Sequence, residues 1–304
     1  MRFIFSFSRT VLILVCLASI YFFCHKQTDG FAILKIRESF TDHSIPHLSP
    51  IYSDETLSFV RNLLNRPLTY LGRGGQCYAF ATEDNQYVVK LLKYNNNYPL
   101  FLFRLCPFPF GFEKERQAVL TKKRGKLMGE YKSYQIALEN LSVETGLLYF
   151  HLDQHTLPNA QLQLVDKLHI LHTIPADSVQ FYIQKKGTAL YPEFLRMIEL
   201  QQLDQAKQSL DEITAYLLKR CQKQITDKDD GIWRNFAFCE GHPFQIDIGQ
   251  FCYDPTLIST ADYQKNLLFF TKDFRNWLTQ TEPSLAQYFS HTLETLHAMD
   301  QTSF

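Results

Sequence analysis

An acidic loop in the C-terminal half of the chain contains residue types that can bind a metal ion and accept a proton. Residues 226–238 read TDKDDGIWRNFAF, and an Asp-Ile-Gly motif follows at residues 247–249. A carboxylate can accept the proton of a hydroxyl group, while an amide and a second carboxylate can hold Mg²⁺ against phosphate oxygens. The order and spacing of Asp230, Asn235 and Asp247 therefore predict a catalytic base followed by two metal ligands.

Two other acidic residues of this loop, Asp227 and Asp229, need no catalytic explanation. Acidic side chains in turns are usually solvated, and we expect Asp229 to point into solvent while Asp230 faces the acceptor. A solvated acidic turn does not explain why Asn235 and the Asp-x-Gly motif both lie at the distances that metal binding requires. The loop therefore carries the most specific chemical signal in the sequence.

Two weaker motifs lie in the N-terminal half. Residues 71–80 read LGRGGQCYAF, and glycines between two strand-like pieces let backbone amides approach phosphate oxygens closely. The following strand-like piece ends in Lys90, whose ammonium would lie on one face of a sheet. Gly72, Gly74 and Lys90 are therefore candidate phosphate-binding residues. Each motif by itself is also compatible with a glycine-rich hairpin turn or an ordinary strand lysine.

Taken in order, these motifs resemble the protein-kinase-like superfamily over residues 68–250. The loop itself is similar to that of toxin–antitoxin serine kinases and small-molecule phosphotransferases. The resemblance implies ATP and Mg²⁺ as cofactors, with Lys90 acting in phosphate binding and catalysis. It also implies a glutamate partner for Lys90 on the next helix, for which Glu130 is preferred over Glu139 and Glu144. The backbone near Gln184 would hold adenine.

The sequence departs from the family pattern at several positions. Lys228 and Asp229 replace His-Arg before the predicted base, Cys77 stands where a third glycine is expected, and Ile248 replaces phenylalanine. No Ala-Pro-Glu motif follows. These departures argue against a regulated eukaryotic-type kinase and leave the phosphate acceptor undefined.

The periodicity of apolar residues predicts the elements that position these motifs. The predicted strands cover residues 68–72, 77–82, 86–93, 162–174 and 179–185. The predicted helices cover residues 53–64, 113–127, 130–152, 203–225, 263–278 and 284–299. This order indicates an α+β protein with a two-lobed protein-kinase-like fold, in which an antiparallel five-strand lobe (residues 53–186) precedes a mainly helical lobe (residues 187–304).

An apolar helix is expected before these two lobes. Residues 10–24 are uncharged and mostly apolar, with Arg2 and Arg9 before them. Residues 1–26 therefore predict a single-pass membrane anchor, and residues 27–52 a linker. The positive-inside rule would place the body outside the cytoplasm. A cleaved signal, which would give a secreted protein, remains an alternative.

The composition restricts the classes of partner. Lys+Arg and Asp+Glu both number 31, and this zero net charge argues against nucleic acid as a partner. The 7 cysteines are scattered, without a C-x-x-C pair that would indicate zinc. The predicted function is ATP-dependent phosphoryl transfer to a hydroxyl on a protein, sugar or lipid-linked acceptor. Two alternatives remain open: a membrane-tethered pseudokinase that binds nucleotide or protein, and an unrelated membrane-anchored interaction protein.

Overall fold

The computed structural model describes residues 2–37, 50–93, 113–152, 156–229 and 231–296. The chain divides into two compact units, which we treat one at a time. Unit 1 contains residues 1–105 and 149–183, and unit 2 contains residues 106–148 and 184–304. The lobe boundaries expected from the sequence stay a prediction.

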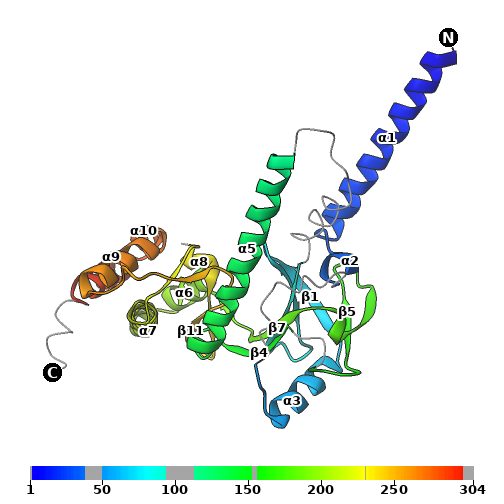
Figure 1. Cartoon of the computed structure of the whole chain (residues 1–304). Coiled ribbons are helices and arrows are strands. Elements are labelled where there is room, and N and C mark those ends of the chain that lie inside the picture. Colours follow the sequence, from blue (N-terminus) through cyan, green and yellow to red (C-terminus); the bar gives the residue numbers. More distant parts are fainter. Residues whose placement is uncertain (1, 38–49, 94–112, 153–155, 230, 297–304) are drawn as a thin grey trace. The chain divides into compact units, whose positions relative to one another are not determined.

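A mixed seven-stranded sheet forms most of unit 1 (Figure 1). Its strands lie in the order β4-β7-β3-β2-β1-β5-β6. They are β1 (Leu68–Arg73), β2 (Cys77–Ala81), β3 (Tyr87–Leu92), β4 (Leu147–His151), β5 (Gln161–Val165), β6 (Leu171–Pro175) and β7 (Phe181–Lys185). β1 pairs antiparallel with β2 but parallel with β5. The α+β class is confirmed, whereas the predicted five-strand antiparallel sheet is wrong in strand number and direction.

Local features of the chain explain the two extra strands. The sequence Leu-Leu-Tyr-Phe-His of β4 fits a buried helix as well as a strand, and the prediction assigned it to the preceding helix. The helix instead ends at Asn140, and a turn over residues 142–146, in which Gly146 has a φ of 59°, leads into β4. The predicted strand 162–174 is a hairpin, because Asp166 Oδ1 accepts the N–H groups of Leu168 and Ile170 and so closes a turn.

Side chains that alternate along the strands of unit 1 point to opposite faces of the sheet, and one of these faces is buried. Tyr78 pairs with Leu91 and Phe80 pairs with Val89, so these four buried side chains share a face, which we call the packed face. Helix α3 (Asp54–Leu64) begins at Ser53 as predicted, where the N–H of Thr56 donates to the Ser53 hydroxyl at 3.2 Å. Lys90 pairs with Ala79, and both therefore lie on the opposite face.

Residues 28–37, which were expected to belong to a linker, cover part of the packed face. The Phe31 ring centroid lies 5.2 Å from that of Tyr78 and 5.4 Å from that of Phe80. The Tyr78 hydroxyl donates to Gly30 O at 2.7 Å. Gly30 has a φ of +69°, and an added side chain would lie 2.5 Å from His25 Nε2, so this turn requires glycine.

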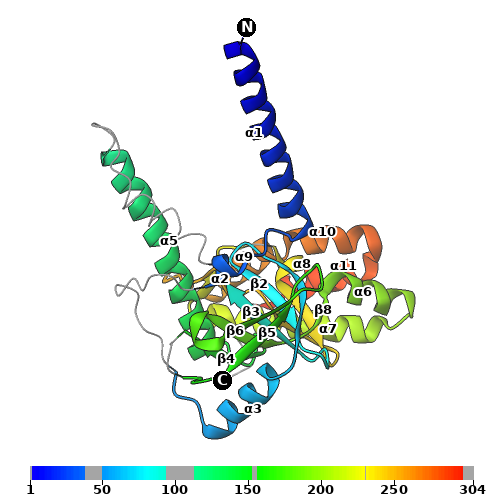
Figure 2. The same cartoon turned by 90° about the vertical axis from the view of Figure 1, so that its right-hand side faces the viewer.

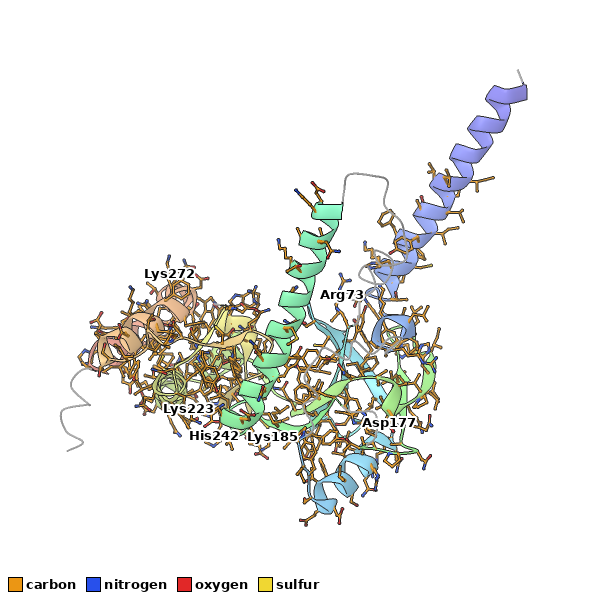
Figure 3. The ribbon with its side chains drawn as sticks, viewed as in Figure 1. Arg73, Asp177, Lys185, Lys223, His242 and Lys272 are labelled. Atoms are coloured by element: carbon orange, nitrogen blue, oxygen red, sulfur yellow. The ribbon has the colours of Figure 1, made fainter. Side chains whose placement is uncertain are left out.

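Two further interactions hold this segment on unit 1. Arg73, labelled in Figure 3, donates from Nη1 to Asp29 O at 2.9 Å. Lys35, in the short helix α2 (Ile33–Ile36), donates from Nζ to Gly30 O at 2.7 Å. Ile36 is fully buried. The turn after the first helix is therefore an integral part of unit 1.

The N-terminal helix α1 covers Arg2–Gln27. Among the helices of the described residues, none combines the length and the apolar character needed to cross a membrane. The predicted single-pass membrane anchor is therefore wrong.

Unit 2 is mainly helical. The long helix α5 (Glu113–Asn140) replaces the two helices predicted at 113–127 and 130–152. The remaining elements are β8 (Thr188–Ala189), α6 (Leu190–Glu199), α7 (Leu203–Gln222), β9 (Ile225–Asp227), α8 (Ile232–Asn235), β10 (Phe236–Cys239), β11 (His242–Gln245), β12 (Phe251–Tyr253), α9 (Thr260–Phe270), α10 (Lys272–Thr281) and α11 (Pro283–Glu294). Helices α6, α7, α9, α10 and α11 pack together (Figure 2).

We predict that Phe31→Ala lowers the free energy of unfolding by about 3–5 kcal/mol, because it leaves a cavity on the packed face. Leu34→Ala is the matched control, since Leu34 is 67% exposed in the same segment, and its effect should stay within about 0.5 kcal/mol. Urea denaturation of the full chain measures both. Equal, small effects would show that residues 28–37 do not stabilise unit 1.

Candidate active site

The hairpin of β10 and β11 brings two of the predicted metal ligands to one place in unit 2. Phe236 pairs with Gln245, and the N–H of Ile246 donates to Asn235 O at 2.7 Å. Asn235 and Asp247 therefore both lie at the open end of the hairpin, although twelve positions separate them in sequence. The twelve-position spacing between Asn235 and Asp247 arises because the whole β10–β11 hairpin, residues 236–245, lies between them.

The surroundings of Asn235 and Asp247 suit a cation that keeps part of its hydration shell. Asn235 is 2% exposed, and its Nδ2 donates to Asp229 O at 3.3 Å, so the amide oxygen is the atom that could bind a metal. Asp247 Oδ1 accepts the N–H of Gly249 at 3.1 Å. Within the described residues, no group of three or more His, Cys, Asp and Glu side chains could hold a metal. The pair fits Mg²⁺, which commonly combines few protein ligands with waters and phosphate oxygens.

Asp230, the predicted base, lies outside the described residues, but its neighbour Asp229 is well defined. Asp229 Oδ1 accepts hydrogen bonds from the N–H of Gly231 at 3.0 Å and from Arg234 Nη2 at 2.7 Å. These interactions lower the pKa of Asp229 against the opposing effect of its burial. The expectation that Asp229 points into solvent is therefore wrong, because its side chain closes the turn and pairs with Arg234.

A buried polar network lies beneath this loop. Gln245 Nε2 donates to Asp227 Oδ2 at 2.6 Å and to Asp247 O at 3.1 Å. Gln245 Oε1 accepts from the Tyr216 hydroxyl at 2.6 Å and from Arg220 Nη1 at 3.2 Å. Asp227 Oδ1 in turn accepts the N–H of Asp229 at 2.9 Å. One glutamine side chain thus connects the start of the loop to the backbone of a predicted metal ligand.

Asp227 is 6% exposed and was wrongly taken for a solvated turn residue. It ends β9, which pairs with β12, and α7 covers it with Arg220 Nη1 at 4.0 Å. Burial raises the pKa of Asp227 to about 6, although Arg220 and the two N–H donors lower it. The carboxyl group is therefore held in an environment that disfavours its charge.

The residues of α7 in this network were not singled out in the sequence, although a signal was present. The predicted apolar stripe of α7 is confirmed, with Ile213, Leu217 and Cys221 buried. Tyr216 and Arg220 are one turn apart beside that stripe, so the helix period alone places them near the core. An arginine at such a position requires a buried acceptor, which indicates a polar network.

In unit 1, strand register brings Gly72 and Lys90 to one row. Gly72 pairs with Ala79 across β1 and β2, and Ala79 pairs with Lys90 across β2 and β3. The row lies on the face opposite the packed face. The N–H of Gly74 donates to Cys77 O at 3.0 Å and closes the turn between β1 and β2. A side chain added at Gly72 meets no atom within 4 Å, so packing within the chain does not require this glycine.

The two remaining predicted residues lie in unit 2. Glu130 is on α5 and 7% exposed, with Lys126 Nζ 3.9 Å from its carboxylate, and its pairing with Lys90 stays a prediction. Gln184 is 1% exposed and donates from Nε2 to Thr145 O at 2.9 Å. The chain passes from unit 1 to unit 2 between Ile183 and Gln184.

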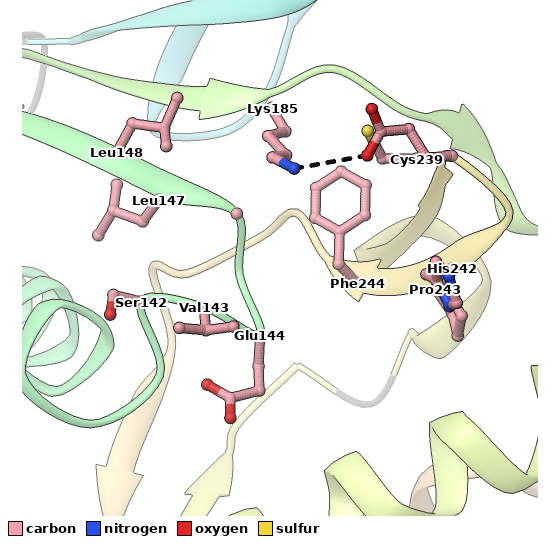
Figure 4. A pocket seen from close by; sticks show the side chains of 12 residues that line it. Ser142, Val143, Glu144, Leu147, Leu148, Lys185, Cys239, His242, Pro243 and Phe244 are labelled. Carbon is pink, nitrogen blue, oxygen red and sulfur yellow. Dashed lines mark ion pairs between the residues drawn. The ribbon is translucent and has the colours of Figure 1, made fainter.

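A pocket of about 450 Å³ lies elsewhere in unit 2 (Figure 4). It is formed by the loop before β4 and by the β10–β11 hairpin, with Leu147 and Phe244 among its apolar residues. Lys185 and Glu240 form an ion pair of 3.7 Å at its edge. Among the described residues that line this pocket, Glu144 is a less favoured candidate for the partner of Lys90, and none belongs to residues 226–235 or to the Asp-Ile-Gly motif.

We predict that the free energy of unfolding of the wild-type chain falls, relative to Asp227→Asn, as pH rises from 4 to 7. The folded chain keeps a proton on Asp227 up to about pH 6, whereas the unfolded chain loses it near its ordinary pKa of 3.8. Stability from this proton is thus complete below the unfolded pKa and is lost as pH rises through the folded one, by about 3 kcal/mol. Urea titrations at several pH values measure this difference, and a constant difference would contradict the prediction.

Comparisons with known proteins provide no family assignment. No protein-family model matches the chain, and no curated protein matches it. It is similar to a high-resolution (2.2 Å) crystal structure of WbdD, with a TM-score of 0.34, 15% identity, and coverage of 74% of this chain and 44% of that one. A medium-resolution structure of the bifunctional kinase-methyltransferase WbdD gives a TM-score of 0.34, 15% identity and coverage of 73% and 43%. The chain thus spans less than half the length of these solved chains, and a likeness this remote supports no functional argument.

Proposed function

We propose that this chain is an ATP-dependent phosphotransferase with a two-lobed protein-kinase-like fold, which transfers the γ-phosphoryl group to a hydroxyl acceptor. The observation that carries the proposal is the juxtaposition of Asn235 and Asp247 at the end of one hairpin. An amide and a carboxylate held this way suit Mg²⁺ with bound phosphates. Asp230 is proposed as the base that accepts the acceptor's proton.

The buried network supports this assignment. Phosphoryl transfer depends mainly on positioning and on electrostatic stabilisation, so the loop that carries the reacting groups must be rigid. Gln245 ties Asp227, at the start of the loop, to the backbone of Asp247. Asn235 is tied to the same loop through Asp229 O. These bonds restrict the positions of both proposed metal ligands.

Unit 1 supports the proposal through the row of Gly72 and Lys90. A glycine that packing does not require is explained by the close approach of a ligand, because phosphate oxygens can then reach the backbone. Lys90 on the same face would supply positive charge, with Nζ 5.5 Å from the Tyr182 ring centroid. We assign phosphate binding to Gly72, Gly74 and Lys90, and adenine binding to the backbone near Gln184.

Asp247→Asn should abolish the magnesium dependence of ATP binding, because a neutral amide binds Mg²⁺ far more weakly than a carboxylate does. Asp254→Asn is the matched control: Asp254 also accepts an N–H two residues ahead, from Thr256, but lies outside the proposed site. Calorimetric titration with ATP, with and without Mg²⁺, tests both variants of the full chain. An Asp247→Asn chain with unchanged metal dependence would remove Asp247 as a metal ligand.

Asp230→Asn should lower phosphate transfer, including autophosphorylation, about 100-fold or more, with little change in ATP affinity. Asp229→Asn should be milder, because the amide oxygen can still accept the N–H of Gly231 and only the charge beside Arg234 is lost. Transfer of radioactive phosphate from ATP measures both. If Asp229→Asn were the inactive variant and Asp230→Asn active, the base would be Asp229. Wild-type chain that binds ATP without any transfer would instead support a nucleotide-binding module.

A further inference from the structure

A second pocket of unit 2 has a volume of about 730 Å³ and is lined by helix α5, by strand β12 and by the loop that follows β9. We call it the lysine pocket, after Lys132 on α5 and Lys228 in that loop. Its volume is in the range of cavities that bind small organic molecules. Asn235 and Asp247 are not among the described residues that line it, so the lysine pocket is a separate site.

Helix α5 contributes one of its faces to the lysine pocket. Lining residues 125, 128, 129, 132 and 136 share that face, because residues three and four positions apart are neighbours on a helix. A side chain added at Gly125 or at Gly129 would meet no atom within 4 Å. Glycine inside a helix lowers its stability relative to alanine, and packing against the described residues requires neither glycine. The space beside this face of α5 is therefore open to a ligand.

Apolar side chains make up part of the lining. Ile136 and Phe251 are buried, and Met128 is half-buried. Burial raises the pKa of the Cys252 thiol, which also belongs to the lining, so this group stays uncharged at neutral pH. The lysine pocket can therefore hold the apolar part of a ligand.

Two ammonium groups from separate elements, those of Lys132 and Lys228, line the same pocket. Within the described part of the chain, neither lysine forms an ion pair. Like charges that share a cavity repel each other, and a bound anion would offset this repulsion. The pocket of about 450 Å³ differs, because its Lys185 pairs with Glu240.

The net charge of the lining indicates the kind of anion. Glu139 is the one acidic residue among the described residues of the lining, and its Oε1 accepts from Gln135 Nε2 at 2.9 Å. Together with Lys132 and Lys228, the lining carries two positive charges and one negative charge, a net charge of +1. A monoanion matches this charge, whereas the second charge of a dianion would be repelled by Glu139.

We propose that the lysine pocket binds a small monocarboxylate with an apolar body, independently of the proposed function. Ammonium groups form charge-assisted hydrogen bonds with carboxylate oxygens. The Tyr253 hydroxyl accepts from Asn140 Nδ2 at 3.3 Å, so its own proton is available to the same carboxylate. The apolar body lies against Ile136 and Phe251, and its removal from water favours binding.

A carboxylate bound in this way also contacts the loop of the candidate active site. Lys228 lies between Asp227 and Asp229, and its N–H donates to Gln250 O at 3.1 Å. Occupancy of the lysine pocket therefore restricts the loop that carries Asp229.

Calorimetric titration of the full chain, without ATP and without Mg²⁺, tests the binding. The probes are benzoate, 3-phenylpropionate and hexanoate, their neutral primary amides, and phenyl phosphate as a dianion. At least one carboxylate should bind saturably, about tenfold or more tightly than its amide, because only the charged form gains from the two lysines. Phenyl phosphate should bind more weakly than that carboxylate.

Gly129→Leu should abolish this binding, because its side chain fills the open space beside α5. Leucine favours a helix more than glycine does, so the variant should unfold at no lower temperature than the wild-type chain. A carboxylate affinity that Gly129→Leu leaves intact would place the ligand elsewhere and overturn the proposal.

The charge variants test the two signs separately. Lys132→Met should weaken carboxylate binding about tenfold, whereas Lys132→Arg, which keeps the charge, should retain most of the affinity. Glu139→Gln should strengthen binding, because it removes the repelling charge. Lys122→Met is the matched control, since Lys122 is an exposed lysine of α5 outside the lining, and it should leave the affinity unchanged.

Three further results would overturn the proposal: no saturable binding of any of these carboxylates, equal affinity for carboxylates and amides, or tighter binding of phenyl phosphate than of every carboxylate. Because neither ATP nor Mg²⁺ is present, none of these results bears on the proposed function.

Discussion

The amide group of Gln245 hydrogen-bonds in two directions: its nitrogen donates to Asp227 and to Asp247 O, and its oxygen accepts from Tyr216 and Arg220. The four partners come from three parts of unit 2, so one planar group relates α7, the loop and the end of the hairpin. Because an amide has a donor end and an acceptor end, only one orientation satisfies all four bonds. The positions of Asn235 and Asp247 depend on this arrangement. Asn235 directly precedes β10, Asp247 follows β11, and Gln245 is the residue of β11 that pairs with the first residue of β10.

Burying the charged group of Arg220 in this hydrogen-bond network costs free energy. Arg220 is 1% exposed, and within the described residues its Nε and Nη2 atoms have no hydrogen-bond partner. The Phe270 ring, 4.5 Å from its guanidinium carbon, supplies part of the compensation. Buried ion pairs of this kind are often no more stabilising than apolar side chains of equal size. We infer that the pair of Arg220 and Asp227 serves to specify the geometry of the loop.

In unit 1, the buried side chains that stabilise the sheet lie on one face, and the candidate phosphate-binding residues lie on the other. Phe31 lies against Tyr78 and Phe80 on the packed face, whose residues are almost completely buried. Gly72, Ala79 and Lys90 lie on the opposite face in one cross-strand row. Substitutions on the packed face are therefore expected to lower stability, whereas substitutions in the row are expected to affect the proposed phosphate binding with little effect on the fold.

Local patterns in the sequence determined several elements, because the information for them lies within a few neighbouring residues. The cap at Ser53 and the apolar stripe of α7 are of this kind. Only the tertiary structure decided that β1 pairs in parallel with β5 and that residues 28–37 cover the sheet. It also decided that Asp227 is buried and that Tyr191 meets Trp277. These features depend on contacts between residues far apart in the chain, which neither spacing nor periodicity can indicate.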